Sequence, residues 1–334
     1  MDQQDLTLWR NRTGEIIQKM KSKPFRAMLI AVLAVSLAPA TKADEGGVAF
    51  WFSGQYASFA AVPASPGLSL PAQGYYYSGN ASGDKTLPRG NVATAGLDSS
   101  APLIMVQPTY APRKKLWGGQ VAIGLGFGWG GNKTSADFAI TNLVPEINRT
   151  DSITGFTDLY PIASLAWHKG NDNWMAYITG DIPTGDYNPN RLSNLGIGHG
   201  AVDVGGGFTY FNETKGLEFS TVVGVTYNME NNDTNYQNGI DVHLDWALSQ
   251  FLNAHWQVGL VGYLYSQITD DSGSSPFAED VKSSIASIGP EIGYSFTINK
   301  QAAYINLRGY WEFAAKNRIE GAAAFLTLSL PIGD

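Results

Sequence analysis

Bulky apolar side chains alternate with small or polar ones along most of the chain after residue 70. Residues 117–130 read WGGQVAIGLGFGWG, where the odd positions are mostly bulky and apolar and the even positions are mostly glycine. Residues 240–249, IDVHLDWALS, carry apolar side chains at every even position and place Asp241, His243 and Asp245 on the other face. Successive side chains of a β-strand point to opposite faces, so this period of two predicts strands that are apolar on one face only.

The stretch GFGWGG at 126–131 also matches the G-x-G-x-x-G fingerprint of dinucleotide-binding proteins, and Glu146 follows at the expected ~20 residues. That fingerprint requires glycines at the end of a strand and a helix N-terminus that receives the pyrophosphate. Here the glycines lie within a strand pattern, and the following NKTSADF has no helical apolar period. We therefore interpret the match as accidental and predict no cofactor.

The alternation predicts about 12 strands, each near or above the ~9–11 residues that a strand needs to cross a bilayer. The predicted strands are 70–80, 101–112, 117–130, 156–169, 172–182, 200–212, 217–225, 240–249, 255–269, 284–298, 302–314 and 319–331.

The connections between these strands sort by length onto two sides. If the first strand runs upward, the upper connections are 81–100, 132–155, 183–199, 229–238, 270–283 and 315–318. The lower ones are short: 113–116, 170–171, 213–216, 252–254 and 299–301. Long external loops, short periplasmic turns and an even strand number are typical of outer-membrane barrels, whereas a soluble sandwich has no reason to sort its loops. We predict an all-β fold, a transmembrane antiparallel β-barrel over residues 70–331.

The N-terminus predicts export. Residues 27–38 form a short apolar run, preceded by Lys19, Lys21, Lys23 and Arg26 and followed by small-residue cleavage sites. This is the pattern of a secretory signal peptide, assigned to residues 1–43, with Met20 as an alternative start. The chain has no Cys, only 15% charged residues and a net charge of −7, which argues against nucleic acid as a partner. We expect the Gram-negative outer membrane as its location and outer-membrane lipid as its surroundings.

Residues 44–69 are too irregular for a strand and carry Pro63 and Pro66. Counting them as a strand would also make the strand number odd. We interpret them as a plug inside the barrel, with an N-terminal arm as the alternative. Their rings are expected to contact an apolar solute or to pack the plug against the wall: Phe50, Trp51, Phe52, Tyr56 and Phe59.

Nine ionisable side chains fall on the inward face of the predicted strands: Asp181, Asp203, Glu218, Asp241, His243, Asp245, Glu291, Arg308 and Glu312. Two interpretations stay open for them. They set ion preference or hold the plug through switchable pairs, or they form a hydrogen-bond network that stiffens a narrow barrel. Four scattered His and no Cys argue against a structural metal site, so we predict no metal.

The stretch GDIPTGDYNP at 180–189 resembles the meta-pathway of phenol degradation (MetA-type) family of outer-membrane proteins. EGGVAFWFSGQYASFAAVPASPG at 45–67 and TDLYPIASLAWHKGN at 157–171 support the resemblance. The matching positions of the first stretch are Asp181, Pro183, Thr184, Gly185, Tyr187 and Pro189. The resemblance implies a barrel similar in outline to long-chain fatty-acid and aromatic-hydrocarbon transporters, passing hydrophobic or aromatic small molecules.

We therefore expect a monomeric outer-membrane channel without enzymatic activity, for passive or facilitated uptake of hydrophobic or aromatic small molecules. Two alternatives from other classes remain. One is a barrel-embedded lipid hydrolase or acyltransferase, which needs a Ser–His pair converging from neighbouring strands. The other is a structural or adhesive barrel whose long loops bind partners.

Overall fold

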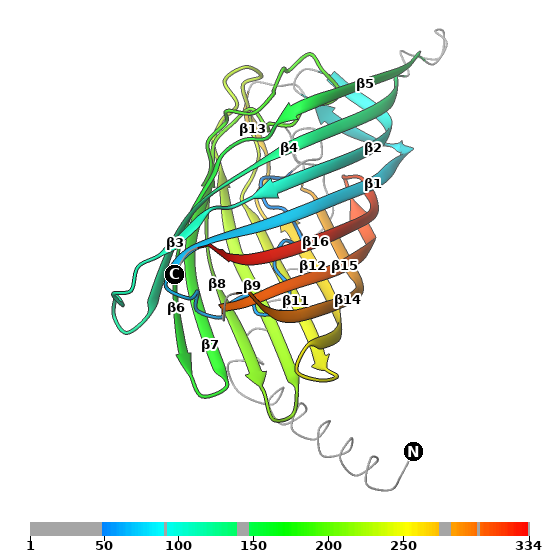
Figure 1. The fold of residues 1–334 in the computed structure, drawn as a ribbon. Coiled ribbons are helices and arrows are strands. Elements are labelled where there is room, and N and C mark those ends of the chain that lie inside the picture. Colours follow the sequence, from blue (N-terminus) through cyan, green and yellow to red (C-terminus); the bar gives the residue numbers. More distant parts are fainter. Residues whose placement is uncertain (1–48, 90–91, 139–146, 274–281, 299–300, 333–334) are drawn as a thin grey trace, which may run out of the picture. The chain divides into compact units, whose positions relative to one another are not determined.

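The computed structural model describes residues 49–89, 92–138, 147–273, 282–298 and 301–332. The predicted signal peptide, residues 1–43, lies outside these ranges, as do the first residues of the predicted plug. The described residues form strands and connections, shown as a ribbon in Figure 1, and contain no helix. Among them, no helix is long and apolar enough to span a membrane.

The described chain forms the strands β1 (Gly67–Arg89), β2 (Val92–Val106), β3 (Thr109–Ala111), β4 (Gln120–Phe138), β5 (Ile147–Phe156), β6 (Tyr160–Lys169), β7 (Asp172–Asp181), β8 (Ala201–Asn212), β9 (Leu217–Asn228), β10 (Tyr236–Gln237), β11 (Asp241–Phe251), β12 (Trp256–Gln267), β13 (Ser272–Gly273), β14 (Ser284–Ile298), β15 (Gln301–Lys316) and β16 (Glu320–Ile332). β3 continues β2, since both pair with β1 and β4. In the same way β5 and β6 both pair with β4, one after the other along its length. β10 and β13 pair only with each other, as a short ribbon between connections.

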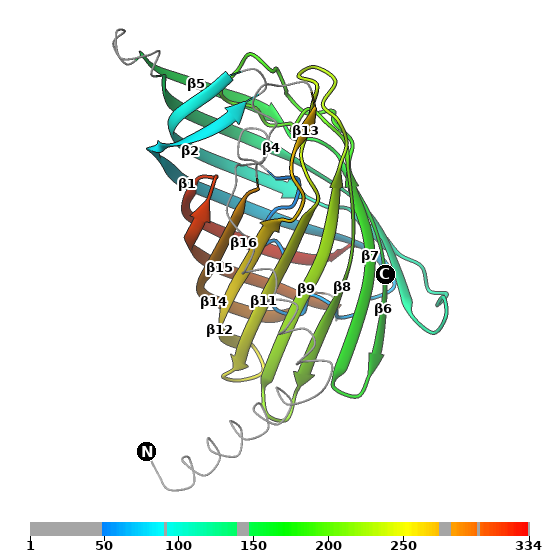
Figure 2. The same cartoon turned by 180° about the vertical axis from the view of Figure 1, so that it is seen from behind.

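Antiparallel pairing runs around the whole sheet and closes on itself. β1 pairs with β2 on one side and with β16 on the other, in a ladder from Leu68↔Ile332 to Asn80↔Glu320. Within the described residues this gives a closed barrel of 12 strands (Figure 2). Closure leaves no unpaired sheet edge, which a chain in hydrocarbon cannot tolerate. The predicted fold class is confirmed, and every predicted strand overlaps a barrel strand.

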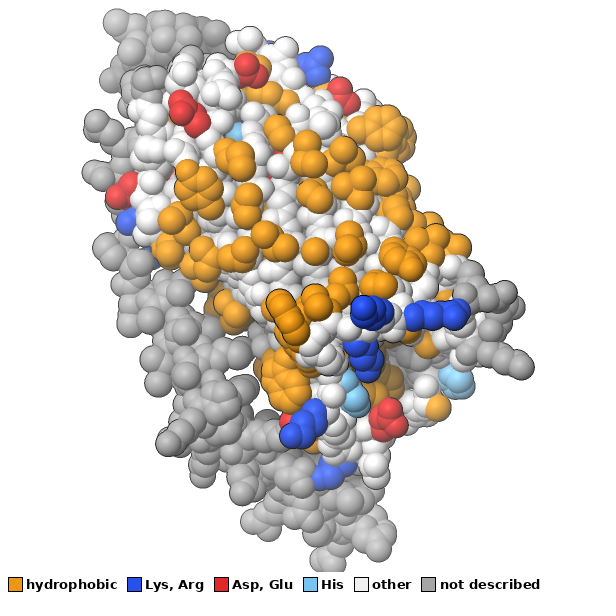
Figure 3. Space-filling model, turned by 90° about the vertical axis from the view of Figure 1, so that its left-hand side faces the viewer, with side chains coloured by type: hydrophobic (Ala, Val, Ile, Leu, Met, Phe, Trp, Pro, Cys, Tyr) orange, Lys and Arg blue, Asp and Glu red, His pale blue; other side chains and the backbone are white. Residues whose placement is uncertain are grey.

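The exterior of the barrel is apolar. On β4 the exposed side chains are Ile123, Leu125 and Trp129, whereas the alternate positions Ala122, Gly126 and Gly128 are buried. Figure 3 shows apolar side chains gathered as a broad band over one face, with Lys and Arg side chains clustered near one end of it. Exposed Trp side chains lie near strand ends, among them Trp117, Trp256 and Trp311. An apolar band with aromatic residues at its borders is the surface that a bilayer covers.

Two of the predicted long loops are instead strand. Residues 81–89 and 92–100 pair within the β1–β2 hairpin, and residues 132–138 pair with 147–153 of β5. The prediction of loops over 81–100 and 132–155 is wrong for these residues. These residues extend past the apolar band, so their sequence carries no apolar face. Strand pairing continues there because backbone hydrogen bonds do not depend on an apolar face.

The core of this barrel is its interior. Tyr263, Tyr310 and Phe325 point inward from β12, β15 and β16 and are almost fully buried. They pack with Ala49 and Phe52 of the chain that precedes β1. The interior is therefore filled by side chains and by residues 49–66, whose backbone crosses between the walls (Figure 2).

Candidate functional site

The backbone of residues 49–66, here called the inner segment, donates hydrogen bonds to acceptors on the barrel wall. The amides of Gly54 and Tyr56 donate to the Asp245 carboxylate on β11, at 2.9 and 3.2 Å. The amide of Phe59 donates to Glu218 Oε1 on β9, at 3.0 Å. An irregular segment has no strand partner for its N–H groups, and buried N–H groups need acceptors. The inward carboxylates provide them.

A nearby strand, β15, supplies donors to the carbonyl groups of the same segment. Arg308 donates from Nε to Gly54 O at 3.1 Å and from Nη2 to Gln55 O at 2.8 Å. Tyr310 Oη also donates to Gly54 O, at 3.1 Å. Gly54 has φ +83°, and a Cβ there would lie 2.9 Å from the Tyr310 ring, so the contact requires glycine.

Ser58 lies between two carboxyl groups. Its Oγ is 2.9 Å from Glu218 Oε2 and 2.5 Å from Glu291 Oε1, and Ser249 Oγ is 3.0 Å away. A hydroxyl has one hydrogen to donate. The arrangement is satisfied when one of the two carboxyl groups carries a proton and donates it to Ser58. Both acids thus hold the inner segment.

Trp51 anchors the other half of the inner segment. Its ring stacks on the His243 imidazole of β11, with ring centroids 3.5 Å apart. The ring of Tyr177 on β7 also stacks with Trp51, with centroids 5.9 Å apart. His243 Nε2 is 2.9 Å from Asp203 Oδ2, which fixes the imidazole against the wall. Thr226 Oγ1 donates to the same Asp203 oxygen, at 2.6 Å.

The three further residues of the predicted inward set are Asp181, Asp241 and Glu312. Asp241 accepts from Asn228 Nδ2 at 2.8 Å. Glu312 accepts from Tyr77 Oη at 2.9 Å and from Tyr263 Oη at 2.6 Å. Asp181 is buried at the end of β7, and its carboxylate oxygens have no hydrogen-bond partner within the described part of the chain. Thus Glu218, Asp245, Glu291 and Arg308 contact the inner segment, whereas Asp241 and Glu312 bond to wall residues, and both interpretations of the inward charges stay predictions.

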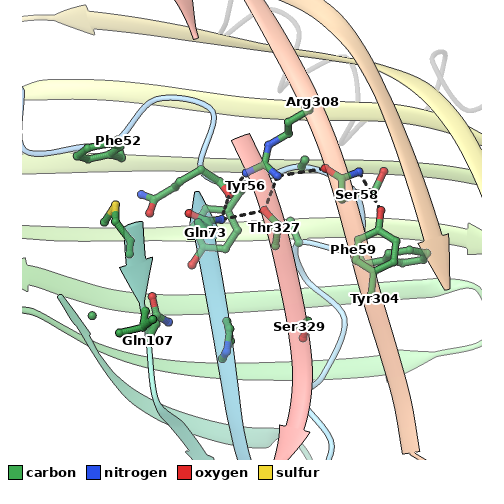
Figure 4. A pocket seen from close by; sticks show the side chains of 18 of the residues that line it. Phe52, Tyr56, Ser58, Phe59, Gln73, Gln107, Tyr304, Arg308, Thr327 and Ser329 are labelled. Carbon is green, nitrogen blue, oxygen red and sulfur yellow. Dashed lines mark hydrogen bonds between the residues drawn. The ribbon is translucent and has the colours of Figure 1, made fainter. Parts of the chain in front are cut away.

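A cavity of about 600 Å³ lies between the inner segment and the wall. All five aromatic side chains predicted for this segment line it, from Phe50 to Phe59. The wall contributes residues from the short-turn ends of β1, β2, β14, β15 and β16, including Gln73, Gln107, Phe296, Tyr304 and Thr327. Figure 4 shows Phe52, Tyr56, Phe59 and Tyr304 around this space, with Arg308, Gln73 and Thr327 joined by hydrogen bonds. Its volume falls within the ~300–1,000 Å³ range of small-molecule sites.

Sequence reasoning missed the neutral members of the site. Thr209 and Ser220 accept from the amides of Ala61 and Ala60, and Asn306 donates to Glu291. Each occupies an inward position in the alternation, so the period of two already assigned them to the lumen. Neutral inward side chains are common in any barrel, so the alternation alone does not show which of them contact the inner segment.

The motif stretch forms the connection between β7 and β8, residues 182–200, and is held by Asp158. The Asp158 carboxylate accepts from the amides of Gly185 at 2.7 Å and Ile197 at 2.8 Å, which joins the two ends of the loop. Burial raises the pKa of Asp158, and these backbone donors act against that rise. A Cβ at Gly185 would lie 2.6 Å from the backbone of Thr157, so the approach needs glycine.

The other motif residues frame this loop. Tyr187 Oη accepts from Asn231 Nδ2 at 2.7 Å, whereas Pro183, Thr184 and Pro189 are exposed. The loop also reaches the far wall, since Leu192 is buried against Ala81, Leu97, Ala136 and Ile319. The motif thus builds a loop that crosses the long-loop end of the barrel.

We expect Asp158→Ala to release this loop. The variant loses two hydrogen bonds to a charged acceptor, each worth about 1.5–3 kcal/mol, so the open loop should become at least about tenfold more populated. Trypsin added to intact cells should then cut after the exposed Arg191 correspondingly faster. Asp233→Ala, in another exposed connection, is the matched control and should leave the rate unchanged. Equal cleavage rates in wild type and Asp158→Ala would show that the hydrogen bonds of Asp158 do not hold the loop.

Among the described residues no group of three or more His, Cys, Asp and Glu is placed to hold a metal ion. The site instead consists of a cavity lined by aromatic side chains and by polar side chains of the barrel wall. A closed 12-stranded barrel with an apolar exterior and a polar interior defines the class: this is an outer-membrane β-barrel.

Residues 78–328 match the family model described as "Putative MetA-pathway of phenol degradation", and the chain belongs to that family. The resemblance predicted from the motifs is therefore confirmed. No curated protein sequence matches the chain.

Two solved structures are similar to the chain. An outer membrane channel from Pseudomonas putida F1 superposes with a TM-score of 0.64 at 13% identity, over 80% of this chain and 97% of that chain. A Pseudomonas aeruginosa FadL homologue gives a TM-score of 0.42 at 10% identity, over 87% of this chain and 98% of that chain. At 13% identity the likeness to the P. putida channel shows the fold alone.

Proposed function

We propose that this protein is an outer-membrane channel for passive or facilitated uptake of hydrophobic and aromatic small molecules. The observation that carries the proposal is the aromatic-lined cavity inside the barrel, bounded by the inner segment on one side and the wall on the other. The family description, which names phenol degradation, and the name of the P. putida structure, an outer membrane channel, support the same function.

In this proposal the inner segment is the plug expected from the sequence. Its hydrogen bonds to Asp245, Glu218 and Arg308 hold it across the lumen and leave the cavity beside it. The β7–β8 loop, residues 182–200, narrows the opening of the barrel at the end that carries the long loops. A solute therefore meets two constrictions, and the aromatic cavity lies beside the inner segment.

Filling the cavity tests the proposal. Ser329 lines the cavity and shares the inward face of β16 with Thr327, so Ser329→Phe should obstruct the cavity and lower uptake of radiolabelled toluene several-fold in cells with an intact lipopolysaccharide layer. Ala286→Phe adds the same side chain on the outward face of β14, paired with Phe313, and should leave uptake unchanged. Uptake in the wild type no faster than in cells without the protein would remove the channel proposal.

A further inference from the structure

Arg308 is the one residue with a formal charge among the described residues that line the cavity. The rest of the lining is aromatic, aliphatic or made of neutral amides and hydroxyls. The Arg308 side chain is almost fully buried, at 3% exposure. A buried guanidinium stays charged, and its burial is costly unless hydrogen bonds and an opposite charge compensate it.

The hydrogen bonds of Arg308 go to neutral acceptors. Besides the carbonyl groups of Gly54 and Gln55, Nη1 donates to Asn306 Oδ1 at 3.2 Å and to Thr327 Oγ1 at 2.7 Å. These bonds use four of the five N–H groups of a guanidinium.

Two carboxylates lie near this guanidinium, but other donors hold them. Glu291 is the strand partner of Arg308, and its oxygens accept from Ser58 and Asn306. Asp245 accepts from the amides of Gly54 and Tyr56. Neither residue lines the cavity, so the cavity side of Arg308 faces no carboxylate of the described chain.

Thr327 adds a second donor beside Arg308. Its Oγ1 accepts from Arg308 Nη1 and from Gln73 Nε2, at 2.7 and 3.3 Å (Figure 4). Because the oxygen already accepts two hydrogen bonds, its own hydrogen remains to be donated. The cavity therefore has a hydroxyl donor and one positive charge in the same lining as the aromatic rings.

We propose that the cavity selects aromatic carboxylates, with the ring among the aromatic side chains of the inner segment and the carboxylate against Arg308 and Thr327. This inference rests on the proposed channel function and names its solute class. A monoanion places an opposite charge on the cavity side of Arg308, where no carboxylate of the described chain lies, and charge-assisted hydrogen bonds discriminate more strongly than neutral ones. A neutral isostere of the same size fills the cavity without this charge interaction.

Calorimetric binding of benzoate and benzamide to the detergent-solubilised full-length protein tests this selection. We expect the wild type to bind benzoate about 10- to 100-fold tighter than benzamide, the range of a hydrogen bond to a charged group. Arg308→Gln should remove that preference, whereas Arg308→Lys should keep part of it. Thr327→Val should weaken benzoate binding about 2- to 10-fold and benzamide binding less. Benzylammonium, with the same ring and the opposite charge, should not bind.

Equal affinities for benzoate and benzamide in the wild type would overturn the inference, as would a preference that survives in Arg308→Gln. Heat-modifiable gel migration shows whether each variant is folded. If Arg308→Gln does not fold, the inference is tested by the benzoate and benzamide affinities of the wild type and of Thr327→Val. If toluene enters cells through the protein but benzoate has no advantage in binding, the channel stands and only the solute class fails. If no aromatic solute enters, the channel proposal itself fails.

Discussion

Deleting residues 49–66 should raise single-channel conductance several-fold and make the channel more cation-selective. The segment fills the lumen through backbone hydrogen bonds to Glu218 on β9, Asp245 on β11 and Arg308 on β15. Without it, the carboxylates of Asp245, Glu218 and Glu291 line a wider aqueous path and attract cations. Planar-bilayer recordings of the purified protein measure both changes.

The barrel should survive this deletion because its strand ladder closes between β1 and β16 without the inner segment. Heat-modifiable migration is the control for folding. Saturable uptake of an aromatic solute should be lost, since the rings that line one side of the cavity are removed. Unchanged conductance in a folded deletion variant would mean that the segment does not limit the path. Combining the deletion with Asp158→Ala then tests whether the β7–β8 loop does.

An arginine on the lipid face should destabilise the barrel strongly. Leu260 points outward from the middle of β12, between Leu248 and Pro290 of the neighbouring strands, and is 49% exposed. Leu260→Arg should cost about 2–4 kcal/mol of folding free energy if this position lies near the bilayer midplane. Leu260→Phe, which stays apolar, is the matched control and should cost far less. Urea unfolding in lipid vesicles measures the difference, and equal costs for both variants would mean that this face does not contact lipid.

Inward positions do not all tolerate charge in this barrel, in contrast to a water-filled porin. His243 is inward, but its ring is packed between Trp51 and Asp203 and is 1% exposed. The lumen here is a packed interior in which Asp203, Glu218 and Asp245 accept hydrogen bonds from specific protein groups. A substitution such as His243→Arg is expected to displace Trp51 rather than to enter water.

The strands could be predicted from the sequence because each strand alternates apolar and polar side chains along its own residues. The alternation in 117–130 and 240–249 reflects an apolar medium on one side and a polar interior on the other, and β4 and β11 follow it residue by residue. The extensions of β1, β2, β4 and β5 beyond the apolar band escaped prediction. There the exterior is water, no apolar face is required, and only backbone pairing maintains the strand.

The amino-acid sequence by itself determined the barrel, the family, the irregular N-terminal segment and the set of inward ionisable residues. Only the tertiary structure decided which of these residues meet. Asp245 and Arg308 reach adjacent residues of the inner segment from two separate strands, and Asp158 joins the ends of a loop that begins more than twenty residues later. The reason is physical: an irregular backbone must find buried partners for its N–H and C=O groups, and closure of the barrel determines which side chains are within reach.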